Sequence, residues 1–293
     1  MSQTAAGQET GRAARNNLAF NVLLMVLKLV VGIWARSEAL IADGLHSGAD
    51  VFSSVAVMVG LAIAGRPPDS GHHYGHAKAE AISQKVVAVL LLLAGLEVAN
   101  SAIAGIEHPG PAPDWIALAV ALVAMVPKGV MAVTQRRLAK RTGSHAILAA
   151  ATDNVTDAIS SLVASLGILA SRLGYASGDS VAALVVAALV MWAGVDVFRT
   201  AAVDLMDPAA DPETTQALRE RAQAVAGVLS LSSMRTRLNG ARIFVDLEIE
   251  VDRHLSLLAA HDIAHQVEDA LKAEPRVEGV TVHVNPAGED GKG

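Results

Sequence analysis

Six stretches of the chain consist almost entirely of apolar residues, and short polar segments separate them. They cover residues 18–35, 40–64, 81–106, 115–133, 146–173 and 180–198. Each approaches or exceeds the roughly 20 residues that a helix needs to cross the hydrocarbon core of a bilayer. Because a soluble domain has no use for six such helices, the pattern predicts an α-helical membrane protein with six transmembrane helices.

The pattern changes in the last third of the chain, where short elements of different periodicity follow one another. "PETTQALRERAQAVAG" and "SLLAAHDIAHQVEDALKAE" are typical of amphipathic helices. Two alternating β-rich runs joined by "NG" predict a hairpin, and "GVTVHV" predicts a third strand. The order α-β-β-α-β predicts a small cytosolic α/β sandwich, whose limited core favours dimerisation.

A shift from apolar to charged composition near residue 204 divides the chain. We expect a disordered tail at 1–16, a transmembrane domain at 17–203, a linker at 204–211, a cytosolic domain at 212–286 and a disordered tail at 287–293. Lys and Arg concentrate in the flanks on the side of the N-terminus, which marks the cytoplasmic side. The chain is therefore predicted to be a multi-pass protein of the inner (cytoplasmic) cell membrane with both termini cytoplasmic.

Composition and charge narrow the classes of function. The formal net charge of −6 carries no basic signature, so we expect no nucleic-acid partner. The chain has no cysteine, which excludes disulfides and thiolate metal sites. Only 18% of the residues are charged, so the ionisable residues inside the apolar stretches stand out.

Two of the predicted helices carry pairs of metal-ligand residues four positions apart. The pairs are His46 with Asp50 and Asp153 with Asp157, and that spacing places both members on one face of a helix. Ionisable side chains inside a span are costly and usually face a cavity, a partner or an ion. The two pairs can converge into one site of four ligands, and hydrogen bonding between helices is the alternative.

Asp43 lies one turn before His46, near the same face of the predicted helix. It can be a fifth ligand, an acceptor for the imidazole N–H, or a solvated residue at the outer lip of the site. We favour the solvated position.

Three carboxylates in one buried site favour protonation of at least one of them when no metal is bound. An arriving dication then displaces protons, and arriving protons displace the dication. This is the chemistry of a metal/proton exchanger. An intramembrane metalloenzyme is a weaker alternative because four ligands leave no open water position on a tetrahedral metal, and a metal sensor is another. We predict no enzymatic activity and no cofactor besides the transported metal.

These residues lie within or beside the motifs "SEALIADGLHSGAD", "PPDSGHHYGHAKAE" and "TDNVTD". In their order and spacing the motifs resemble the cation diffusion facilitator family of dimeric, proton-coupled zinc, manganese and iron exporters. The resemblance covers about residues 12–285. It implies six transmembrane helices, a cytosolic metallochaperone-like (ferredoxin-like) α/β domain and a homodimer. It also implies a transport site at His46, Asp50, Asp153 and Asp157, on the second and fifth helices.

The resemblance also assigns roles to the loop between the second and third helices and to one pair of charged residues. Asp69, His72 and His76 match an accessory metal site in this loop, with His73 as an alternative ligand, and a solvated His-rich loop is the competing interpretation. Lys78 and Asp207 match a pair that relatives use as a charge interlock near the dimer interface.

In the cytosolic domain the match to the zinc-type ligand pattern is incomplete. His261 and His283 stand at ligand positions, and Glu248 replaces a histidine. Ser232 and Asn285 stand where relatives have ligands, and His265, one turn after His261, can compensate. The implied regulatory metal site is therefore weaker than in those relatives.

Asp153 occupies a position where zinc-transporting relatives typically have a second histidine. One nitrogen and three carboxylates form a harder site, which suits Mn²⁺ or Fe²⁺, although Zn²⁺ also accepts carboxylates. We narrowly favour proton-coupled efflux of Mn²⁺ by alternating access over efflux of Zn²⁺, with Fe²⁺ after both.

Overall fold

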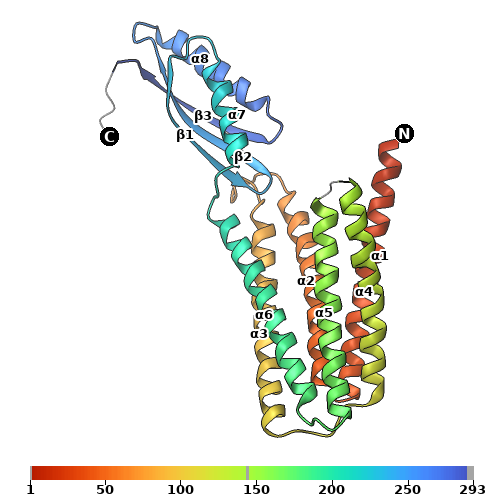
Figure 1. Cartoon of the computed structure of the whole chain (residues 1–293). Helices are drawn as coiled ribbons and strands as arrows, with labels where there is room; N and C mark the ends of the chain where they lie inside the picture. The colour runs from red at the N-terminus through yellow and green to blue at the C-terminus, as the bar shows by residue number, and fades with distance from the viewer. Residues whose placement is uncertain (1, 143–144, 289–293) are drawn as a thin grey trace. The chain divides into compact units, whose positions relative to one another are not determined.

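A computed structural model describes residues 2–142 and 145–288 of the chain. The elements follow in the order α1 (Ser2–Trp34), α2 (Glu38–Ala64), α3 (Ala79–Glu107), α4 (Trp115–Thr142), α5 (His145–Arg172), α6 (Gly178–Leu205), α7 (Pro212–Gln223), β1 (Ser230–Asn239), β2 (Arg242–Val251), α8 (Leu257–Lys272) and β3 (Val277–Pro286) (Figure 1). They form two compact units. The helical unit contains residues up to 58 and 83–199, and the α/β unit contains 59–82 and the residues from 200 onward.

The helices of the first part agree with the predicted spans in order and position. Five of them, α2 to α6, are long and apolar enough to cross a membrane. The apolar part of α1, Leu18–Trp34, is shorter than these five helices. The first of the six predicted spans is therefore not confirmed as long enough to cross a membrane. Helix α1 begins at Ser2 and thus includes most of the stretch for which a disordered tail was predicted; this stretch contains four alanines, two glutamines and two arginines, which favour helix.

Small side chains let the helices of the helical unit approach closely. The buried core between α2, α3, α4, α5 and α6 consists mostly of alanines, with Leu40, Val186 and Ile168 among its larger members. At Gly167 of α5 a Cβ atom would lie 2.2 Å from the Cβ of Ala182 on α6. Only a glycine fits there, as is typical of close contacts between membrane helices.

The α/β unit has the predicted order of two helices and three strands. Its sheet has the strand order β1-β2-β3. Strands β1 and β2 run antiparallel, and β2 and β3 run parallel. The predicted hairpin is confirmed: Asn239 pairs with Arg242, and Gly240 turns the chain with φ of 61°. One face of β2 is buried against α7 and α8, because Ile243, Val245, Leu247, Ile249 and Val251 share a core with Leu218 and Leu271.

The C-terminal tail predicted at 287–293 falls mostly outside the described residues. The last strand ends at Pro286.

Candidate metal centre

Three of the four residues predicted as ligands gather around one lysine in the helical unit. Nε2 of His46 lies 3.5 Å from Oδ1 of Asp157, which joins α2 to α5. Nζ of Lys128, on α4, lies 2.5 Å from Oδ2 of Asp157 and 3.9 Å from Oδ2 of Asp50. His46, Lys128 and Asp157 are buried, whereas the side chain of Asp50 is 40% exposed. Helices α2 and α5 therefore approach each other at these residues, and an ammonium group from α4 lies beside their carboxylates.

Lys128 is not among the residues predicted from the sequence. It lies within the apolar run "LVAMVPKGVMAV", and a charged residue inside a span is itself a sign of function. Counted at about 1.5 Å per residue from the helix ends at Glu38, Trp115 and Arg172, Asp50, Lys128 and Asp157 lie at depths of roughly 18–22 Å. This common depth, near the middle of a bilayer, is the signal that points to a shared site.

Asp153 lies apart from the other three. It is exposed, one turn from Asp157 on α5, and only one group of three or more ligand atoms within 4.8 Å of one another occurs among the described residues, at Asp69, His72 and His76. The four intramembrane residues thus flank one region without closing into a tetrahedral cage. Such an open, partly exposed arrangement can admit an ion from one side.

Asp43 corrects our expectation of a solvated lip residue. It is completely buried, and Nζ of Lys28 on α1 lies 2.8 Å from its Oδ2. Ser160 and Ser161 of α5 donate hydrogen bonds of 2.8 Å to its two oxygens. Lys28 also donates to Ser47 and Ser161 at 2.8 and 3.0 Å. Both oxygens of Asp43 therefore accept hydrogen bonds. Asp43 belongs to an ion pair with Lys28 whose contacts connect α1, α2 and α5.

The loop residues predicted as an accessory site do lie together in the α/β unit. Nδ1 of His72 is 3.3 Å from Oδ1 of Asp69, and Nε2 of His76 is 3.4 Å from Oδ2. Backbone N–H groups of Gly71 and His72 donate to the same carboxylate and lower the pKa of Asp69. The carboxylate is therefore ionised at neutral pH and offers an oxygen to a cation, while His73 is outside the cluster.

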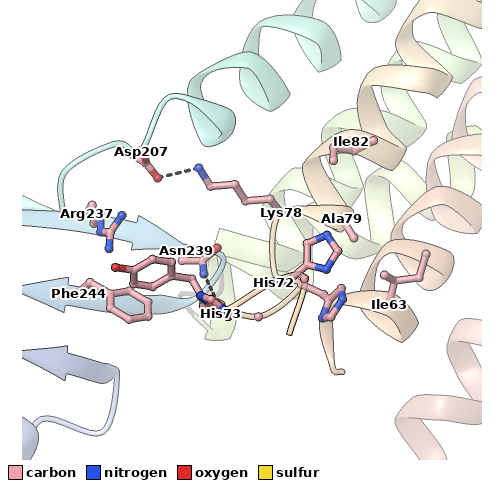
Figure 2. A pocket seen from close by; sticks show the side chains of 14 residues that line it. Ile63, His72, His73, Lys78, Ala79, Ile82, Asp207, Arg237, Asn239 and Phe244 are labelled. Atoms are coloured by element: carbon pink, nitrogen blue, oxygen red, sulfur yellow. Dashed lines mark hydrogen bonds and ion pairs between the residues drawn. The ribbon is translucent and has the colours of Figure 1, made fainter. Parts of the chain in front are cut away.

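A cavity of about 590 Å³ beside this loop is lined by residues of both parts of the α/β unit. Figure 2 shows His72, Lys78 and Ile82 on one side and Arg237, Asn239 and Phe244 of the hairpin on the other. Asn239 donates a 2.8 Å hydrogen bond to the backbone oxygen of Tyr74, whose ring lies 5.6 Å from that of Phe244. The loop is thereby attached to the sheet.

The predicted pair Lys78–Asp207 forms at the same place. Nζ of Lys78 donates to Oδ1 of Asp207 at 2.7 Å (Figure 2) and lowers the pKa of that carboxyl group. Both side chains are partly exposed, so water screens the attraction and the pair contributes at most about 1 kcal/mol to stability.

The residues predicted as ligands in the cytosolic domain are divided between two surfaces. Glu248 and His283 are register partners on β2 and β3, on the face of the sheet opposite the helices, because the buried core alternates with them. His261 lies on α8, where its Nε2 is 3.0 Å from Nε2 of His265. Within the described part of one chain, these residues do not form a three-ligand cluster.

Comparison with known proteins identifies the family. Residues 16–206 match the cation efflux transmembrane domain, and residues 210–287 match the cytoplasmic domain of cation efflux proteins. The manganese efflux system protein MneS of Bacillus subtilis is 34% identical over 92% of this chain and 93% of its own length. MneP of the same organism is 32% identical over 93% of this chain and 95% of its own.

The likeness extends to other lineages and to a solved domain. The magnetosome protein MamB of Paramagnetospirillum magneticum is 32% identical over 91% of each chain. The solved fragment MamM-CTD 215-293 covers 25% of this chain and 95% of its own, with 28% identity and a TM-score of 0.25. The family consists of metal-ion transporters and not of enzymes. By the match of both its domains and of these relatives along nearly their whole length, the chain belongs to the cation efflux (cation diffusion facilitator) family of membrane metal transporters.

Proposed function

We propose that this protein exports a divalent transition-metal ion from the cytoplasm in exchange for protons, with Mn²⁺ favoured narrowly over Zn²⁺ and then Fe²⁺. The observation that carries the proposal is the position of His46, Asp50 and Asp157 around a buried cation at the middle of the span. These side chains attract positive charge to a depth where charge is otherwise excluded. Two manganese efflux proteins among its relatives agree with the choice of metal.

We place the protein in the cytoplasmic membrane as a homodimer with both termini inside the cell. The positively charged flanks support the orientation. The match to the family's cytoplasmic domain and the open face of the small sheet support dimerisation.

A flux assay with purified protein in sealed liposomes tests the exchange. With a panel of Mn²⁺, Zn²⁺ and Fe²⁺ and a pH-sensitive dye in the lumen, metal uptake should be accompanied by proton movement in the opposite direction. Protons compete with the metal for His46 and the carboxylates, so apparent metal affinity should fall when the assay pH is lowered from about 7.5 to 6. Flux without proton movement and with a constant affinity would contradict exchange. Binding without any flux would instead support a metal sensor.

Asp153→His tests the assignment of the metal. The substitution replaces an oxygen by a nitrogen and lowers the formal negative charge of the site, and both changes disfavour a hard ion. We expect the Mn²⁺/Zn²⁺ ratio to fall roughly tenfold, equivalent to about 1.4 kcal/mol. The ratio should be measured in flux and in equilibrium binding, because slow release of Zn²⁺ can hide a change in affinity. An unchanged ratio in both assays removes residue 153 as a determinant of selectivity.

We further propose that Asp69, His72 and His76 bind a divalent ion that holds the loop. Asp69→Asn should weaken metal binding to this loop at least tenfold by calorimetry, whereas His73→Ala, one residue from the cluster, should leave it unchanged. Because the lowered pKa of Asp69 keeps its carboxylate ionised at neutral pH, protonation of Asp69 should not limit metal binding there. Equal metal affinities in the two variants would contradict the metal site and support a solvated His-rich loop.

The cytosolic residues His261, His283 and Glu248 are proposed as a weaker regulatory site. Since Glu248 and His283 face away from the helix layer, a site that joins them to His261 requires the partner subunit. The 3.0 Å approach of His265 to His261 supports a contribution from His265.

A further inference from the structure

Lys128 is the one feature of the transport region that neither the ligand set nor the packing explains. Its side chain is 3% exposed at mid-span, beside the proposed ligands Asp157 and Asp50. A buried ammonium group is costly in a bilayer, and an apolar side chain would pack there without that cost. The lysine must therefore serve the carboxylates that surround it.

Nζ of Lys128 lies where a metal bound to Asp157 would have to lie. At 2.5 Å from Oδ2 of Asp157, the ammonium lies on the carboxylate where an incoming cation would bind, since oxygen ligands hold divalent transition metals at about 2.0–2.2 Å. The second oxygen of Asp157 faces His46. A metal bound between His46, Asp50 and Asp157 would meet the ammonium at a distance where two cations repel strongly. Metal and ammonium thus compete for the same carboxylate.

We propose that Lys128 is a tethered counter-cation of the transport site: it neutralises Asp157 and Asp50 while the site is empty and withdraws when the metal binds. The inference rests on the proposed function and adds to it a residue that sets affinity. The competition weakens metal binding. In return the empty site keeps a positive charge beside its carboxylates. After the metal is released, the transporter can therefore return to its starting conformation without unpaired carboxylates in the membrane.

The neighbouring sequence gives the lysine freedom to move. Pro127 lies inside α4, directly before it, and a proline inside a helix removes one backbone hydrogen bond and loosens the local turn. Gly129 follows, and glycine restrains the backbone less than other residues do. The backbone of α4 is therefore weakened on both sides of Lys128, so a change in the local turn can move its buried side chain.

Removing the ammonium tests the competition. In a background lacking the loop site (Asp69→Ala with His72→Ala), free Mn²⁺ is measured by its electron paramagnetic resonance signal during titration of the purified full-length protein. Lys128→Met should tighten Mn²⁺ binding at least tenfold, about 1.4 kcal/mol, and lower the maximal flux in liposomes. Lys128→Arg, which keeps the charge, should stay within about threefold of the parent affinity. Lys85→Met on α3, whose ammonium lies 5.1 Å from the ring centre of Phe198, is the control for loss of a lysine charge.

Thermal unfolding separates competition from a purely structural role. Without metal, Lys128→Met should lower the melting temperature. Saturating Mn²⁺ should restore most of the loss, because the metal then supplies the positive charge beside the carboxylates. Equal destabilisation with and without metal would show a structural role and overturn the proposal, as would unchanged or weaker binding. Lys128→Gln, which can still donate to Asp157, gives the same test should the methionine variant not fold.

One further variant separates failure of this inference from failure of the transport site. Asp157→Asn in the same background must weaken Mn²⁺ binding. If it does while Lys128→Met leaves affinity unchanged, the transport site stands and the counter-cation is rejected. If Asp157→Asn has no effect on binding, the transport site itself is misplaced and the inference falls with it.

Discussion

Asp157→Asn is expected to reduce metal flux in liposomes at least about 100-fold, since substitutions of mere neighbours of metal ligands already cost 10–100-fold. The change removes the charge of the residue that contacts both His46 and Lys128. An amide keeps the shape of the carboxylate and still accepts a hydrogen bond from Lys128, and Asp50 stays 3.9 Å from that ammonium, so the protein should remain folded, although it will be less stable than the parent. Loss of flux can therefore be read as loss of a ligand.

The control for this experiment is Asp196→Asn. Asp196 is an exposed carboxylate on α6 of the same helical unit, so its substitution removes one negative charge without touching the proposed site. Both variants should elute as the parent does in size-exclusion chromatography. Near-normal flux in a folded Asp157→Asn protein would exclude the proposed transport site.

Lys28→Met is expected to destabilise the protein by about 3–5 kcal/mol, the usual cost of leaving one member of a buried ion pair without its partner. Lys28 and Asp43 are both completely buried, so water cannot replace the lost ammonium. The serines that contact Asp43 remain as donors but carry no charge. Reversible unfolding in mixed detergent micelles measures the loss.

The double variant Lys28→Met with Asp43→Leu should recover most of this stability, because replacing both members of a buried pair by apolar residues is often nearly neutral. Lys140→Met, at an exposed position of α4, should change stability by less than about 0.5 kcal/mol. If the single and double variants are equally unstable, the contribution of Lys28 comes from packing and not from its charge.

Much of the architecture followed from local pattern. The lengths of the apolar runs placed α2 to α6, since the thickness of a bilayer sets how many residues a span needs. The "NG" pair and the alternating runs placed the hairpin of β1 and β2, because a tight turn limits the choice of residues. The i,i+4 spacing of His46 and Asp50 located one wall of the candidate site, as a helix places such residues on one face.

Only the tertiary structure decided which charges meet. Lys28 and Lys128 lie on α1 and α4, on different helices from Asp43 and Asp157, and helix periodicity does not tell which face of one helix meets which face of another. For this reason Asp43 changed from an expected lip residue to a member of a buried pair, and Lys128 emerged at the centre of the proposed site. The sequence by itself determined which side chains are costly in a membrane; the packing of the helices determined the partners that offset the cost, because a charge in a low dielectric is stabilised by whatever lies within a few ångströms of it.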